Sequence, residues 1–235
     1  MKSAFETIAT ARHNWQAQTD PAILASHTLL DTAAHNTVRA YLAVLGSIPS
    51  WQPAGLPAID LGAGAGYMTR AFRAAGVDMT AAEHTDEGLA LLRRLNPGLP
   101  VRQADIAQFH EPGRYGLIVA REIYPVTRVN AFTEQHAMLG RLIDSLASGG
   151  VLLLAGSSVH APHCMHYTGM VRTLARDARV RHISGPLIEA LVVKMPWIMC
   201  SPAACVAAHA LAAPLVAWRR RRGWALIRLI AFVKA

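Results

Sequence analysis

The stretch that decides the fold is Ala58–Tyr67, AIDLGAGAGY, in which three glycines at alternate positions follow a short apolar run. Glycine permits a sharp turn and, because it has no Cβ, lets the backbone approach a ligand closely. The apolar run predicts a strand, and the residues from Tyr67 to Ala75 predict a helix that ends at Gly76. A nucleotide-like group held by such a unit lies at the carboxyl ends of the strands. The alternative is an ordinary strand–helix turn.

The order of elements around this loop predicts an α/β fold. Short apolar runs at 58–61, 77–82, 99–101, 116–120 and 150–155 alternate with helical stretches at 66–75, 86–95 and 131–147. This alternation is typical of βαβ units, a parallel sheet and right-handed crossovers. Apolar spacing predicts helices within residues 1–50 and over 165–178 and 185–195, and a terminal strand over 224–234.

Composition narrows the class of protein. The chain has 235 residues, 52% of them apolar and 16% charged, which suits one globular domain with a full core. Three cysteines without a CxxC pair argue against a disulfide framework and a cysteine zinc site. The first fifteen residues lack the apolar run of a secretory signal, so we expect a cytoplasmic protein.

The net charge of +8 favours an anionic partner, and four consecutive arginines occupy 219–222. Basic and aromatic residues do not alternate as in single-strand binders, which argues against nucleic acid. Residues 195–218 carry no Asp, Glu, Lys or Arg, but three prolines interrupt them, so buried or interfacial packing is preferred to a membrane span. Together with the arginines, this segment predicts peripheral contact with an anionic membrane as an alternative.

The glycine spacing and three acidic side chains distinguish this loop from glycine loops that bind a diphosphate. The spacing is GxGxG, whereas the pyrophosphate fingerprint is GxGxxG. Asp60, two residues before the first glycine, offers a carboxylate to an ammonium group and would repel a diphosphate. Glu83, at the end of the second run, is suited to ribose hydroxyls. Asp105, after the third run, is suited to an exocyclic amine, with Ile106 against the base ring.

These motifs together resemble the class I S-adenosylmethionine-dependent methyltransferases. AIDLGAGAG is similar to the first motif of the family, Glu83 to the acid of the second, and ADI at 104–106 to the third. YGLIVA at 115–120 is similar to the fourth strand, and LASGGVLLLAG at 146–156 to the turn and strand that follow. The resemblance covers residues 55–157. It departs at Gly116, where an acid often stands, and at His84, where an aliphatic residue is usual.

The resemblance implies a Rossmann-like, seven-stranded sheet that is mostly parallel with an antiparallel last strand. It implies one domain, with a helical cap at 1–50, a cofactor-binding core at 55–157, and substrate-side elements and the final strand at 158–235. The implied cofactor is S-adenosylmethionine. The residues expected to bind it are Asp60, Gly62, Ala63, Gly64, Gly66, Glu83, His84, Asp105, Ile106 and Arg121.

The acceptor is expected near the segments that follow the fourth and fifth strands. Glu122 or Tyr124 could orient an acceptor hydroxyl, and His163 or His166 could act as a base near neutral pH. The histidines at 160, 163 and 166 could also bind a metal, but Pro162 disfavours a helix there and no acid is nearby, so no metal is expected.

The expected reaction is methyl transfer to an O or N atom of a small-molecule, sugar or lipid-linked acceptor. REIYP at 121–125 lacks the N/DPPY-type motif of many DNA amino methyltransferases, which argues against base methylation. Two alternatives stay open. An NAD(P)-dependent oxidoreductase is compatible with the order of elements, although the glycine spacing and Asp60 argue against it. A non-catalytic cofactor-binding module at the membrane surface is the other.

Overall fold

The computed structural model describes residues 27–49, 51, 55–123, 132–157, 173–195, 198, 203–204, 207–208, 210–212, 214, 218 and 227–235. The strands are β1 (Ala58–Leu61), β2 (Met79–Glu83), β3 (Val101–Gln103), β4 (Tyr115–Arg121), β5 (Leu146–Ser157), β6 (Val180–Ile188) and β7 (Ile227–Lys234). The helices with assigned bounds are α3 (His27–Gly46), α4 (Tyr67–Ala74), α5 (Asp86–Leu95), α7 (Phe132–Ser145) and α9 (Glu189–Lys194).

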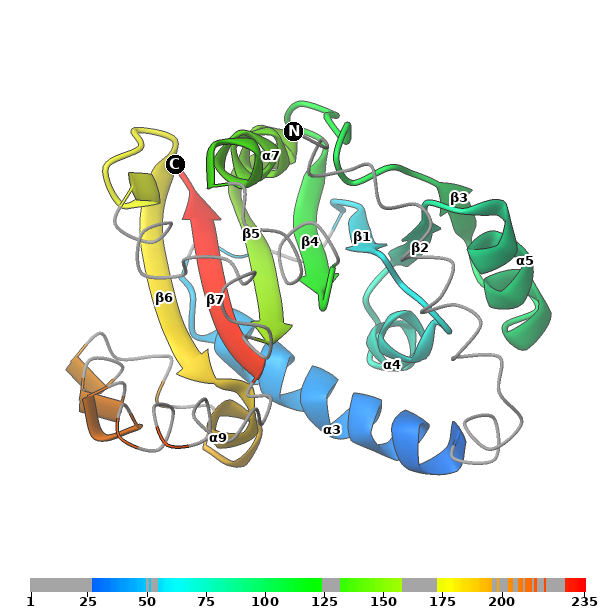
Figure 1. Ribbon diagram of the computed structural model, residues 1–235, viewed down its shortest axis with the longest axis horizontal. Helices are drawn as coiled ribbons and strands as arrows, with labels where there is room; N and C mark the ends of the chain where they lie inside the picture. Colours follow the sequence, from blue (N-terminus) through cyan, green and yellow to red (C-terminus); the bar gives the residue numbers. More distant parts are fainter. Residues whose placement is uncertain are drawn as a thin grey trace.

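The seven strands form one sheet in the order β3-β2-β1-β4-β5-β7-β6 (Figure 1). The first five strands of this order run parallel to their neighbours. β7 lies between β5 and β6 and is antiparallel to both. The predicted Rossmann-like sheet with an antiparallel last strand is therefore confirmed.

The sequence prediction was wrong around the sixth strand. The helix expected over 185–195 is present only as α9, because the residues before it form β6. Within the described part of 165–178, helix is confined to residues 173–174. Gly185 and Pro186 lie inside β6, where the register with β7 shifts between Ser184 and Leu187. Proline is tolerated in a strand at a sheet edge or at a bulge. The Gly-Pro pair suggests a break in the sequence, but it is compatible with β6 because β6 is an edge strand.

Helices cover the two faces of the sheet with separate apolar cores. On one face, α3, α4 and α9 pack against alternate residues of the central strands, such as Ala58, Val119 and Leu153. On the other face, α7 packs against the intervening residues, such as Ile59 and Ile118. Because β1 and β4 are buried on both faces, their sequences read as continuous apolar runs.

Within the predicted N-terminal cap, the described residues include one long helix, α3. α3 packs against α4 and α9, and it extends past the carboxyl ends of β4 and β5 (Figure 1). Tyr41 and Leu45 on α3 are fully buried in the core below it. The rest of the predicted cap, residues 1–26, lies outside the described residues.

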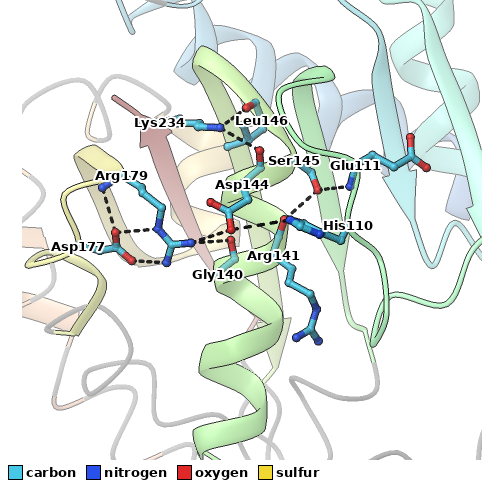
Figure 2. A network of polar contacts seen from close by, with 10 residues as sticks. All are labelled: His110, Glu111, Gly140, Arg141, Asp144, Ser145, Leu146, Asp177, Arg179 and Lys234. Atoms are coloured by element: carbon cyan, nitrogen blue, oxygen red, sulfur yellow. Dashed lines mark hydrogen bonds and ion pairs between the residues drawn. The ribbon is translucent and has the colours of Figure 1, made fainter.

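A network of ion pairs and hydrogen bonds lies at the amino-terminal ends of the central strands, the sheet edge opposite α3 (Figure 2). Arg179 pairs with Asp144 at 2.9 Å and with Asp177 at 2.6 Å. The Lys234 ammonium donates to the carbonyl oxygens of Asp144 and Leu146, at 2.9 and 2.6 Å. These contacts tie the end of α7 and the start of β5 to the β6–β7 pair, far in the chain from the glycine loop.

Candidate functional site

The glycine loop joins the carboxyl end of β1 to α4, at the sheet edge toward which the parallel strands point (Figure 1). Gly62, Gly64 and Gly66 have φ angles of +75°, +58° and +80°. A residue with a Cβ is disfavoured in this conformation by about 1–2 kcal/mol. The N–H groups of Gly62 and Ala63 both donate to the Ala82 carbonyl of β2, at 2.9 and 3.0 Å. The loop is therefore folded tightly against the end of β2.

Internal packing also requires glycine at two of these positions. A Cβ on Gly62 would lie 3.0 Å from Cγ2 of Ile123, and one on Gly66 would lie 2.8 Å from both Asn96 Nδ2 and Leu92 Cδ1. The glycines are therefore required for packing as well as for the predicted approach of a ligand, because Ile123, just after β4, and the end of α5 lie against the same loop.

Asn96, which is not among the predicted site residues, supports the loop through its side chain. Its Nδ2 donates to the carbonyl oxygens of Ala65 and Leu92, at 3.0 and 2.8 Å, and its Oδ1 accepts from Arg70 at 2.9 Å. Arg70 in turn pairs with Asp31 of α3 at 2.6 Å. The only sequence signal for Asn96 was its place before Pro97, which predicts a helix end but no contact with the loop.

The Glu83 carboxylate ends β2 and is bonded to the loop. Its Oε2 accepts from Gly64 N and its Oε1 from His84 N, each at 3.0 Å. Burial raises the pKa of Glu83, and these two backbone hydrogen bonds oppose the rise. A carboxylate offers about four lone-pair positions, so Glu83 has acceptor capacity beyond these two bonds.

Asp60 is buried near the end of β1, with 2% of its surface exposed. The Thr69 hydroxyl on α4 donates to its Oδ2 at 2.7 Å. Burial raises the pKa of Asp60 from 3.8 to about 6; the bond from Thr69 lowers it, the Glu83 charge raises it and the Arg121 charge lowers it. Because this pKa is near neutrality, small changes in the surroundings of Asp60 decide whether its carboxyl group is ionised.

The residues predicted after β2 and β3 also come together. His84 Nδ1 lies 4.0 Å from Asp105 Oδ1, and the Ala104 N–H donates to the Glu83 carbonyl at 2.9 Å. Asp105 Oδ1 accepts from the N–H of Ala107 at 2.8 Å, which fixes the turn after β3. Ile106 is 9% exposed and packs mainly in the core.

At the end of β4, Arg121 takes part in a partly buried ion pair: its side chain is 31% exposed and that of Glu189 is 8% exposed. Its Nε and Nη2 donate to Glu189 of α9, at 3.1 and 2.9 Å, and the Tyr41 hydroxyl donates to the same carboxylate. Burial lowers the pKa of Arg121, but Glu189 more than reverses this and raises it. Burial and Glu189 raise the pKa of Tyr41 well above its usual range. Neither Tyr41 nor Glu189 belonged to a sequence motif, because their partner lies far away in the chain.

Glu122 follows in the left-handed conformation, with φ of +54°. Its N–H donates to the Ala155 carbonyl of β5 at 2.7 Å. This turn directs Ile123, 4% exposed, back against Gly62. A non-glycine residue held in this conformation stores strain, and such residues cluster at functional sites.

Three predicted acceptor-side residues, Tyr124, His163 and His166, lie outside the described residues, so their placement stays a prediction. Among the side chains that the structure does describe, no group of three or more His, Cys, Asp or Glu could hold a metal ion. Within the same part of the chain, no helix combines the length and apolarity needed to cross a membrane.

A cavity of about 300 Å³ lies at the opposite edge of the sheet, at the start of β4 and β5. It is lined by Trp51, Leu56, Gly116, Ser148, Gly149, Gly150 and Arg181. None of the predicted site residues lines it. The site is therefore defined by the loop and the strand ends described above, and not by this cavity.

Comparison with solved structures shows the same fold in methyltransferases. A SAM-dependent methyltransferase of Leishmania major matches 97% of this chain and 82% of its own, with a TM-score of 0.60 and 16% identity. Geranyl diphosphate C-methyltransferase of Streptomyces coelicolor, solved with S-adenosyl-L-homocysteine, matches 84% of this chain and 78% of its own, with a TM-score of 0.52 and 14% identity. At these identities the likeness is one of fold.

Other matches are narrower. The chain spans only 57% of the length of DesVI of Streptomyces venezuelae and 55% of an amino pentose methyltransferase of Micromonospora echinaspora. No family profile and no curated protein sequence matches the chain.

Proposed function

We propose that this protein is an S-adenosylmethionine-dependent methyltransferase that methylates an O or N atom of a small-molecule, sugar or lipid-linked acceptor. The observation that carries the proposal is the set of acids at three neighbouring strand ends around a glycine loop with positive φ angles. Asp60, Glu83 and Asp105 are hydrogen-bond acceptors when ionised. Support also comes from the fold shared with methyltransferases, one of them solved with S-adenosyl-L-homocysteine.

The donors of S-adenosylmethionine match these acceptors. Its ammonium group suits Asp60, its ribose hydroxyls suit Glu83, and its exocyclic adenine amine suits Asp105. A pyrophosphate cofactor such as NAD would bring its negative charges toward the buried Asp60 carboxylate, two residues before the first glycine. Glu83 could accept from a ribose hydroxyl of either cofactor, so the distinction rests on Asp60 and on the glycine spacing. The residues present therefore fit the sulfonium cofactor better than a dinucleotide.

The cofactor supplies an electrophilic methyl group, and the chain's task is to orient the acceptor, exclude water and remove a proton. We assign acceptor orientation to Glu122 and Tyr124, and proton removal to His163 or His166. The support for Glu122 is its strained backbone at the end of β4, between Arg121 and Ile123, the residue that packs against Gly62. The assignments of Tyr124 and of the histidines rest on the sequence resemblance alone.

The test of the cofactor is a thermal-shift titration of the purified protein with S-adenosylmethionine, S-adenosylhomocysteine, NAD and NADP. A ligand at a hundredfold excess over its Kd stabilises the protein by about 2.7 kcal/mol, which raises Tm by several degrees. We expect a shift with the two sulfur nucleosides alone. A shift only with NAD or NADP would overturn the proposal in favour of an oxidoreductase.

Exposed apolar residues favour a lipid-linked acceptor over a soluble one. Leu211 is 82% exposed and Trp218 is 43% exposed, and both precede the four arginines at 219–222. Apolar side chains beside a basic run suit peripheral binding to an anionic bilayer. Co-sedimentation with vesicles of anionic lipid should be strong at low salt and should decline as salt rises. Equal recovery with neutral vesicles would remove this support.

A further inference from the structure

The Arg121–Glu189–Tyr41 cluster joins three elements at the carboxyl end of β4. Tyr41 of α3 is fully buried and the Glu189 side chain of α9 is 8% exposed. Bringing a carboxylate and a guanidinium out of water is costly, and apolar residues of similar size often hold helices together as well. The position of the pair beside the proposed cofactor site therefore calls for an explanation beyond packing.

Strand register places Arg121 diagonally across from Asp60, on the neighbouring strand. Asp60 is paired with Val119 of β4 and with Ala81 of β2. Arg121 and Glu83 each lie two residues further on, so their side chains project from the same face of the sheet as Asp60. Adjacent strands are about 4.8 Å apart. A carboxylate on one side and a guanidinium on the other thus flank the end of β1.

In the described part of the chain, the side chains that change the pKa of Asp60 come from α4, β2 and β4. Thr69 of α4 donates a hydrogen bond to it, Glu83 of β2 brings a like charge, and Arg121 of β4 brings the opposite charge. Burial alone favours the neutral acid, and Glu83 adds to that tendency. The hydrogen bond from Thr69 opposes it most, and Arg121 opposes it as well, as a positive charge from the described part of the chain.

We propose that Arg121 is a positioning residue for the cofactor: its guanidinium, fixed by Glu189 and Tyr41, holds Asp60 in the ionised form that receives an ammonium group. The inference rests on the proposed function, because the ammonium group is that of S-adenosylmethionine. Glu189 has a second effect. Because its negative charge offsets part of the field of Arg121, it limits repulsion between the guanidinium and the incoming ammonium.

The test is the pH dependence of S-adenosylhomocysteine binding, measured by calorimetry between pH 5 and 8.5. In the wild type, affinity should fall as Asp60 takes up its proton, with a midpoint near the pKa of about 6. Arg121→Met removes the positive charge, so the midpoint should rise. Glu189→Gln leaves that charge uncompensated, so the midpoint should fall. Asp60→Asn should abolish the transition, which would assign it to Asp60.

Two further variants keep the test decisive. The double variant Arg121→Met/Glu189→Gln leaves neither charge of the pair without its partner, so it should fold. Its midpoint should rise, but less than in Arg121→Met, where the Glu189 charge is left unopposed. Arg179→Met breaks an ion pair with two carboxylates at the opposite edge of the sheet (Figure 2). It should lower Tm and leave the midpoint unchanged.

Midpoints that coincide in the wild type, Glu189→Gln and the double variant would overturn the inference while leaving the cofactor assignment intact. A wild type that binds NAD but not S-adenosylhomocysteine at any pH would overturn the proposed function, and the inference with it. Midpoints that move in opposite directions would support both.

Discussion

Gly66→Ala should destabilise the protein by about 3–5 kcal/mol. The left-handed backbone, with φ of +80°, costs an alanine about 1–2 kcal/mol. The new Cβ would also meet Asn96 Nδ2 and Leu92 Cδ1 at 2.8 Å, closer than real Cβ atoms come. Relief requires Asn96 to move away from the carbonyl oxygens of Ala65 and Leu92, and overpacking with loss of such bonds costs about 2–3 kcal/mol more.

Gly76→Ala is the matched control, because Gly76 also has positive φ, +88°, but a Cβ there would meet nothing within 4 Å. It should cost only the backbone part, about 1–2 kcal/mol. Urea unfolding followed by circular dichroism gives the free energy of unfolding for both variants. Equal losses in the two variants would refute the argument that Asn96 and Leu92 hold the loop.

Three further outcomes are expected. Because the folded-state pKa of Asp60 is raised from 3.8 to about 6, the folded protein holds this proton longer than the unfolded chain, so stability should fall as pH rises from about 4 to 6. The fall is at most about 3 kcal/mol at 1.36 kcal/mol per pKa unit. Urea titrations at several pH values should show it, and Asp60→Asn should remove it; a slope that persists would assign it elsewhere. Glu83→Gln should weaken S-adenosylhomocysteine binding by about 1–3 kcal/mol in calorimetry, and unchanged affinity would remove Glu83 from the site. Glu122→Gly should be about 1 kcal/mol more stable than Glu122→Ala in urea unfolding, because only the backbone at φ of +54° distinguishes them; equal stability would show that the turn is unstrained.

The parallel half of the fold was predictable because its signals are local. β1, whose predicted and observed bounds coincide, is an apolar run directly before glycines, and α5 lies between Thr85, whose side chain accepts from Gly88 N, and an Asn-Pro-Gly stretch. β6 was missed because its pairing depends on β7, about 40 residues later in the chain, and its Gly-Pro pair imitates a break.

The same distinction holds for the site. Asp60, Glu83 and Asp105 stand at strand ends, where the topology of a parallel sheet brings side chains together, so sequence reasoning could find them. The partners of these residues could not be found in this way. Thr69 reaches Asp60, and Glu189 reaches Arg121, only through the packing of α4 and α9 on the sheet. The sequence around a residue does not predict a contact that depends on how distant helices pack on the sheet.

The placement of β7 between β5 and β6 has a consequence during synthesis on the ribosome. β6 pairs in the sheet through β7 alone, and β7 is made about 40 residues after β6. At roughly 5–20 residues per second, β6 waits about 2–8 seconds for its neighbour. Throughout that interval the β5 edge of the parallel sheet also has an unpaired row of backbone donors and acceptors, the kind of edge to which other chains add. While residues 189–226 are being translated, the nascent chain therefore carries unpaired strand edges on both β5 and β6.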